Sequence, residues 1–351
     1  MSIRTPQHSD CRTVGTRFST DATSRIILTL LFFATSLFAI PPVLSVAQGR
    51  YTVSRPTTLP PIPKEIVPEP EYIPRHAVPV QWENNYENTR STAEISARNL
   101  LIYLYADGIT ELPEALVSSP VIPACRKFDS AILDDELVRE GLDRYTLLKL
   151  PMDTVITGED GEQTPICSLP GFEHMLGHPG LVVIDFADKD QPYYGEVVGI
   201  LPFLRGECPT EKQVAAFLNL PPGTLTQRTL TYAVRIHPDR PLSSDGEPLS
   251  IVVQEATDHA LYQAERGILG HQNFGERSQR VKEVLGSGSP SEICAQSRSG
   301  ENLFEGAIAC MRAWRYSSAH WSIARKDHAY YGYDMARGKN GAWYAVGFFI
   351  N

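Results

Sequence analysis

The stretch SSAHWSIARKDHAYYGYDMARGKNGAWYAVGFF, residues 317–349, decides the fold of the C-terminal part of this chain. Two segments in it place apolar residues with a period of two, which is typical of β-strands, and they flank the string RGKNG. Asn340-Gly341 suits a tight turn between such strands. Most chain termini are frayed and polar, so an aromatic hairpin at the end of this chain predicts that its terminus lies in a core.

Two helices are predicted upstream of the hairpin, separated by a loop rich in glycine and serine. The first spans residues 249–268, gives way at Gly270 and leaves His271 just beyond it. The second covers NLFEGAIACMRAWRYSS, residues 302–318. The small side chains of the first helix predict close packing against a neighbour. Its apolar and small residues recur at steps of three and four: Leu249, Val252, Ala256, Ala260, Ala264 and Ile268.

The sequence pattern of residues 85–225 predicts an α+β unit of unknown type. Helices are predicted over residues 91–108 and 133–150, strands over residues 181–187 and 193–204, and a short capped helix over residues 209–220. The string EHMLGH places His174 and His178 four residues apart, as in a zinc-binding helix. However, Met175 stands where that motif needs a general-base glutamate. We interpret both as loop histidines.

Chain length and net charge limit the classes to which this protein can belong. A chain of 351 residues favours two folded units with accessory segments. Its hydrophobic content of 42% is enough for a sizeable core, and its net charge of -9 argues against nucleic-acid binding, which needs clustered cationic side chains. We therefore exclude a nucleic-acid partner.

The N-terminal residues carry the pattern of an export signal. An arginine-rich start precedes the apolar run of residues 26–40, and the string SVA, residues 45–47, suits cleavage after Ala47. Residues 1–47 are thus a predicted signal peptide, and residues 48–84 a proline-rich linker in extended conformation. The expected location is secreted, periplasmic or at the cell surface. The alternative is an uncleaved signal that anchors the chain in the membrane.

Export makes the cysteines informative, because disulfides persist in oxidising compartments. Cys11 lies in the signal, which leaves an odd number of cysteines in the mature chain. Cys294 and Cys310 flank one short segment, so we predict a disulfide between them. The pairing of the other three remains open.

The C-terminal residues resemble a known family. The serial order of A…HA…LGHQNF, then GEN or EICA, then W..SSAHW, then YYGYDMA…G.NGAWYAV, resembles a CAP domain. This domain is also called the SCP-like or cysteine-rich secretory protein domain, and the likeness is to its bacterial secreted form, over about residues 240–351. It implies an α-β-α sandwich with a central antiparallel sheet, which we place in residues 226–351 of an α+β protein.

The resemblance also implies a site. The cavity of the family is lined by two histidines and two glutamates and can hold a divalent cation such as zinc. The histidines fall at His271 and His320, and the first glutamate falls at Glu301 or Glu292, two registers that the sequence leaves open. The second glutamate is replaced by Ser317 or Ser318. The metal set implied here is His271, His320 and Glu301, because two imidazoles and one carboxylate suffice for zinc.

The expected function is binding. No nucleophile elbow, no phosphate-binding glycine loop and no cysteine with a clear histidine partner occurs in the sequence. We expect an exported, non-catalytic binding or interaction module whose ligand or partner protein lies at the cell envelope or outside the cell. The alternative is a metal-dependent hydrolase that acts on a peptide or cell-envelope substrate at His271 and His320.

Overall fold

The computed structural model describes residues 80–108, 120–158 and 161–351. The predicted signal peptide and most of the proline-rich linker lie outside the described residues. All described residues belong to one compact unit, so the predicted boundary after residue 225 falls within that unit and stays a prediction. No helix in the described part of the chain has both the length and the apolar character needed to cross a membrane.

The first half of this unit contains a four-stranded sheet in the order β2-β1-β5-β6. β1 pairs parallel with β2 and antiparallel with β5, and β5 pairs antiparallel with β6. The strands are β1 (Leu100–Tyr105), β2 (Thr146–Pro151), β5 (Gly180–Ile184), β6 (Val197–Pro202) and the separate pair β3 (Val155–Thr157) and β4 (Gln163–Pro165). The helices are α1 (Tyr86–Ser96), α2 (Val121–Lys127), η3 (Phe128–Ile132), α3 (Glu136–Leu142), η4 (Ile166–Ser168), η5 (Phe172–Met175), η6 (Leu204–Gly206) and α4 (Glu211–Leu218).

Two predicted helices of this region are wrong in their second halves. The segment predicted as one helix over residues 91–108 is the end of α1, a turn at Ala97 with φ of 50°, and strand β1. Likewise, residues 133–150 contain α3 and then β2. β1 lies inside the sheet and is buried along nearly its whole length, so its residues do not alternate. A short apolar run of this kind cannot be told from a buried helix by periodicity.

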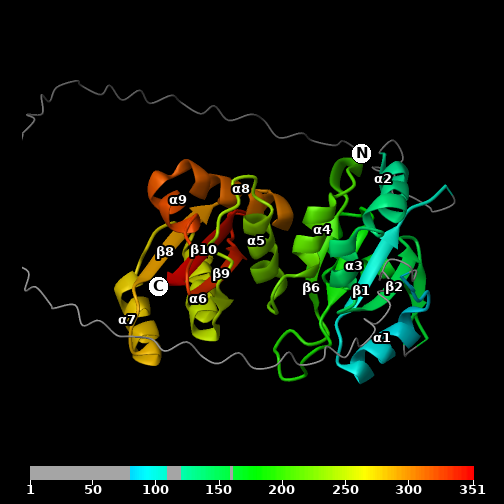
Figure 1. The fold of residues 1–351 in the computed structure, drawn as a ribbon, viewed down its shortest axis with the longest axis horizontal. Helices are drawn as coiled ribbons and strands as arrows, with labels where there is room; N and C mark the ends of the chain where they lie inside the picture. Colours follow the sequence, from blue (N-terminus) through cyan, green and yellow to red (C-terminus); the bar gives the residue numbers. More distant parts are fainter. Residues whose placement is uncertain (1–79, 109–119, 159–160) are drawn as a thin grey trace, which may run out of the picture. The chain divides into compact units, whose positions relative to one another are not determined.

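The second sheet has the order β7-β9-β10-β8 and contains the predicted hairpin (Figure 1). β10 pairs antiparallel with β9 on one side and with β8 on the other. The turn of the hairpin contains Gly341 at φ of 76°, where glycine is favoured. The strands are β7 (Glu247–Pro248), β8 (Pro290–Gln296), β9 (Tyr330–Arg337) and β10 (Trp343–Ile350). The hairpin prediction is confirmed, and the chain end is core.

Helices cover both faces of the second sheet. On one face, α6 and α7 enclose Cys294 and Phe348, and on the other, α8 encloses Ile293 and Phe349. These neighbours in sequence point to opposite faces because strand residues alternate. The helices are α5 (Leu225–Arg235), α6 (Ser250–Arg266), α7 (Phe274–Leu285), α8 (Leu303–Tyr316) and α9 (Ser318–Ala324). The mixture of helices and mainly antiparallel sheets confirms the α+β class.

The segment between α6 and α8 is more ordered than a loop. It contains α7 and β8, neither of which the sequence predicted. β8 was missed because serine, glutamate and glutamine interrupt its apolar residues. In addition, α6 ends one turn earlier than expected, with Gly267 as its C-cap at φ of 67°.

The predicted disulfide between Cys294 and Cys310 is wrong. Both are free thiols, as are the other cysteines of the described residues. Cys294 lies on β8 in the core beneath α6 and α7, whereas Cys310 lies on α8 in the core of the opposite face. The sheet stands between the two thiols, and their proximity in sequence therefore does not bring them together.

Candidate functional site

The structure brings His271, His320 and Glu292 together. Nδ1 of His271 lies 2.8 Å from Oε1 of Glu292, and the ring centroids of His271 and His320 are 5.7 Å apart. Glu301 lies elsewhere, where its carboxylate accepts a hydrogen bond from the backbone N–H of Arg298. The contacts therefore favour Glu292 over Glu301 as the acidic partner of the histidines.

Each of these side chains is positioned by a different element. His271 follows Gly270 in the turn between α6 and α7, and Glu292 points from β8 to the face that these helices cover. His320 lies in the first turn of α9. Ser317, one of the two residues at the second glutamate position of the family, caps that helix through its side chain, which accepts from the N–H of His320. It thus has a structural role in placing His320.

Glu292 is the centre of a buried network that the sequence did not reveal. Its side chain is 1% exposed, and its Oε2 accepts hydrogen bonds from Nε and Nη2 of Arg277 at 3.0 and 2.6 Å. Burial alone would raise the pKa of Glu292, but the hydrogen bond from His271 and the charge of Arg277 hold the pKa below its usual value. Glu292 is therefore ionised, and both of its oxygens are engaged.

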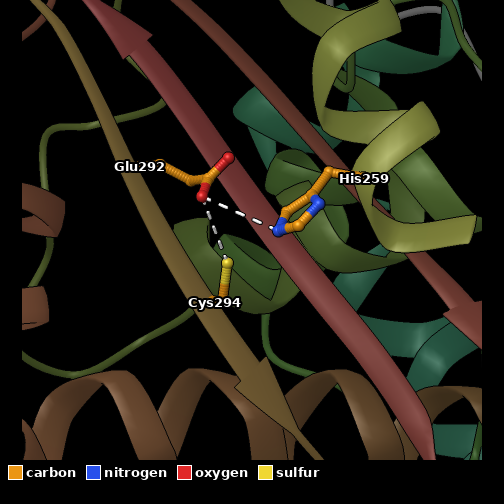
Figure 2. Close-up of side chains that lie close together, drawn as sticks. All are labelled: His259, Glu292 and Cys294. Atoms are coloured by element: carbon orange, nitrogen blue, oxygen red, sulfur yellow. Dashed lines mark hydrogen bonds and ion pairs between the residues drawn. The ribbon is translucent and has the colours of Figure 1, made fainter. Parts of the chain in front are cut away.

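His259 and Cys294 complete this network. Figure 2 shows both side chains directed at Glu292, whose Oε1 lies 3.7 Å from Nε2 of His259 and 3.6 Å from Sγ of Cys294. Nε2 of His259 is also 2.8 Å from the carbonyl oxygen of Gly270. Because that carbonyl can only accept, Nε2 carries the proton. Burial lowers the pKa of His259, and burial together with Glu292 raises the pKa of Cys294 well above its usual value.

His259, Glu292 and Cys294 form the one group of potential metal ligands found among the described residues, with ligand atoms within 4.8 Å of one another. All three are buried. A cation there would have to displace the proton on Nε2 of His259 and the proton of the Cys294 thiol. It would also meet the charge of Arg277, which already neutralises Glu292. The hydrogen bonds of this triad are thus complete without a metal.

His271 has a different character. Its Nδ1 donates to the ionised Glu292, which leaves the lone pair of Nε2 available, and its side chain is 46% exposed. Burial and the neighbouring His271 lower the pKa of His320, which favours its neutral form. A histidine whose second nitrogen is held by a carboxylate is the arrangement that supports metal ligands in proteins. The pair His271 and His320 therefore suits a divalent cation better than the buried triad does.

The residues that sequence reasoning missed were detectable only in part. His259 belongs to the small-residue face of α6. A polar residue on such a buried face is the one feature of the sequence that could have identified His259 as part of a site. Arg277 was hidden because α7 itself was taken for a loop. His174 and His178, which the sequence singled out, lie in and just after η5, and neither belongs to the ligand group.

Comparison of the chain with protein-family models, with curated proteins and with solved structures finds no match in any of the three. The CAP resemblance therefore stays a prediction from the sequence.

The histidines give a testable pH dependence. Burial lowers the pKa of His178, His237, His259 and His320 in the folded chain. Below about pH 6.5 the unfolded chain therefore binds more protons than the folded chain does. The free energy of unfolding should then be highest above that pH and should decrease below it. Glu292, whose pKa is also lowered, should add a further loss in more acidic solution, below about pH 4.5.

The measurement is urea unfolding at about pH 7.5 and about pH 5.5. The variant His259→Gln is expected to reduce the difference in unfolding free energy between these two pH values, whatever its effect on the absolute stability. A variant with the same pH difference as the wild type would show that His259 is not held neutral by burial.

Proposed function

We propose that residues 226–351 form a CAP-type domain of an exported binding or interaction protein, and that His271 and His320 bind a divalent cation. The observation that carries this proposal is the placement of Glu292 at 2.8 Å from His271, with the ring of His320 5.7 Å from that of His271. These are positions that the resemblance assigns to the cavity. Helices on both faces of a mainly antiparallel sheet, with the terminal hairpin at its centre, also support it.

The ligand set proposed here differs from the one implied by the sequence. Glu292 takes the place of Glu301, and it acts through His271 rather than on the cation, because its oxygens are engaged by His271 and Arg277. Two imidazole ligands with further positions open suit zinc, copper or nickel rather than magnesium or calcium, which prefer oxygen ligands.

The same contacts favour binding over hydrolysis. A metal-dependent hydrolase needs a base beside the metal that can take a proton from water. Glu292, the carboxylate next to His271, is held by Arg277 on one oxygen and by His271 on the other. Cys294 is buried with a raised pKa and so lacks the thiolate that a nucleophile requires. The expected activity is therefore capture of a ligand or partner outside the cell.

Calorimetric titration with zinc tests this proposal. Wild-type protein should bind one ion, and His271→Ala and His320→Ala should each weaken binding by about 100-fold or more, since a ligand should matter at least as much as its supporting partner. The double variant should add little, because the two residues act as one site. His174→Ala, which removes a partly exposed histidine outside the cluster, is the matched control and should bind as the wild type does.

The outcome also separates the two functions. Equal zinc affinity in the wild type and in both site variants would overturn the proposed site. Turnover of a peptide or cell-envelope polymer by the zinc-loaded protein, lost in His320→Ala, would instead establish the hydrolase.

A further inference from the structure

Arg228 is an unusual charge in the core of this protein. It lies on α5, is 3% exposed, and donates from Nη1 to the carbonyl oxygens of Leu220 and Pro221 at 3.2 and 2.7 Å. Its Nε and Nη2 atoms have no hydrogen-bond partner within the described residues. No salt bridge of Arg228 occurs there either: its charge acts on the carboxyl group of Asp185, but the two residues do not form an ion pair. A buried cation normally requires such a partner.

Arg228 lines a small cavity between α5 and β9. The cavity has a volume of about 20 Å³, and Tyr331, Tyr333 and Thr231 also line it. This is the space of one water molecule or one monatomic ion. A ligand of several atoms is therefore excluded.

The groups that line the cavity favour a ligand that accepts hydrogen bonds. The hydroxyls of Tyr333 and Thr231 are engaged, with Ser243 and with the carbonyl oxygen of Gln227 respectively. The buried hydroxyl of Tyr331 interacts with the guanidinium of Arg235, whereas Nε and Nη2 of Arg228 have no partner within the described residues. The guanidinium nitrogens can only donate, and the tyrosine hydroxyl can donate as well. Arg235 can only donate to the Tyr331 hydroxyl, so the proton of that hydroxyl stays available, and Arg235 adds a second positive charge near the cavity.

We propose that this cavity is a binding site for a monatomic halide anion, which is chloride in ordinary saline solution. One anion would accept from Arg228 and Tyr331 and neutralise the buried guanidinium. It would thereby connect α5 to β9 beside Val253 of α6, which also lines the cavity. The site is separate from the cluster at His271 and does not depend on the function proposed for it.

Crystals grown or soaked in sodium bromide test the site directly. An anomalous bromide peak within hydrogen-bonding distance of Arg228 and Tyr331 is the expected result. An ordered water at this position without an anomalous signal would overturn the proposal, since Arg228 would then be satisfied by water alone.

Thermal unfolding of the full chain in sodium chloride and in sodium gluconate, at equal ionic strength, gives an independent readout. The melting temperature should rise with chloride and not with gluconate, because chloride binds only the folded state. Arg228→Met should abolish this difference and Tyr331→Phe should reduce it. Arg280→Met, a change in a half-exposed arginine that pairs with Glu255, should retain it. Identical melting temperatures of the wild type in the two salts would overturn the proposal even if Arg228→Met fails to fold.

Discussion

Replacement of Glu292 by glutamine should lower the free energy of unfolding by about 3–5 kcal/mol, the usual effect of breaking a buried ion pair on one side. Glu292 and Arg277 are both almost fully buried, at 1% and 5% side-chain exposure, and their closest contact is 2.6 Å. Glutamine retains the shape of the side chain but removes its charge. Arg277 would then remain as an uncompensated cation in the core.

Urea unfolding of the wild type and three variants measures this effect. Glu301→Gln is the matched control, because Glu301 is only partly buried and its carboxylate accepts a single backbone hydrogen bond; its loss should be at most about 1 kcal/mol. The double variant Glu292→Gln with Arg277→Leu should recover part of the stability lost in Glu292→Gln, because it removes the stranded charge. Similar losses in Glu292→Gln and Glu301→Gln would show that Glu292 is not the centre of the network.

Gly332→Ala should destabilise the protein by about 1–3 kcal/mol or more, which is the range for overpacking of a core. A Cβ atom on Gly332 would lie 2.5 Å from the carbonyl oxygen of Val252 and 2.6 Å from its carbonyl carbon. These are backbone atoms of α6, so no single side chain can move to make room. The whole helix would have to shift away from β9, and His259, which α6 carries, would shift with it.

Gly275→Ala provides a control with the same chemical change. Gly275 lies within α7, and a Cβ atom there would meet nothing within 4 Å. Alanine should stabilise this helix by about 0.5–1 kcal/mol, because glycine is the poorer helix former. Thermal or urea unfolding of both variants should thus give effects of opposite sign. Equal effects would contradict the close approach of α6 to β9.

Several elements could be predicted because their signals are local. The hairpin of β9 and β10 follows from a period of two around Asn340-Gly341, and α4 follows from its capping box, in which Thr210 and Gln213 bond reciprocally. The small-residue face of α6 predicted close packing, which the approach of Gly332 to the backbone of Val252 confirms. Each of these depends on residues that are neighbours along the chain.

Other elements could not be predicted because burial in the tertiary structure decides them. β1 is apolar along its length since neighbouring elements cover it, and this removes the alternation that identifies a strand. β8 directs a glutamate and a cysteine to the face that α6 and α7 cover. A buried face of a strand is usually predicted from apolar residues, so this strand was not recognised. The prediction of a loop there also concealed α7 and, with it, Arg277.

The sequence by itself determined which residue types the C-terminal half offers, namely two histidines, candidate glutamates and an aromatic hairpin. Only the tertiary structure decided which of them meet. The pleat of β8 directs Glu292 and Cys294 to the face of α6 and α7, so Glu292 reaches His271 and Arg277, while Cys294 is kept from Cys310 by the sheet. These contacts join residues that are far apart in the chain. Alternation along a strand predicts to which face a side chain points, but it does not identify the element that covers that face.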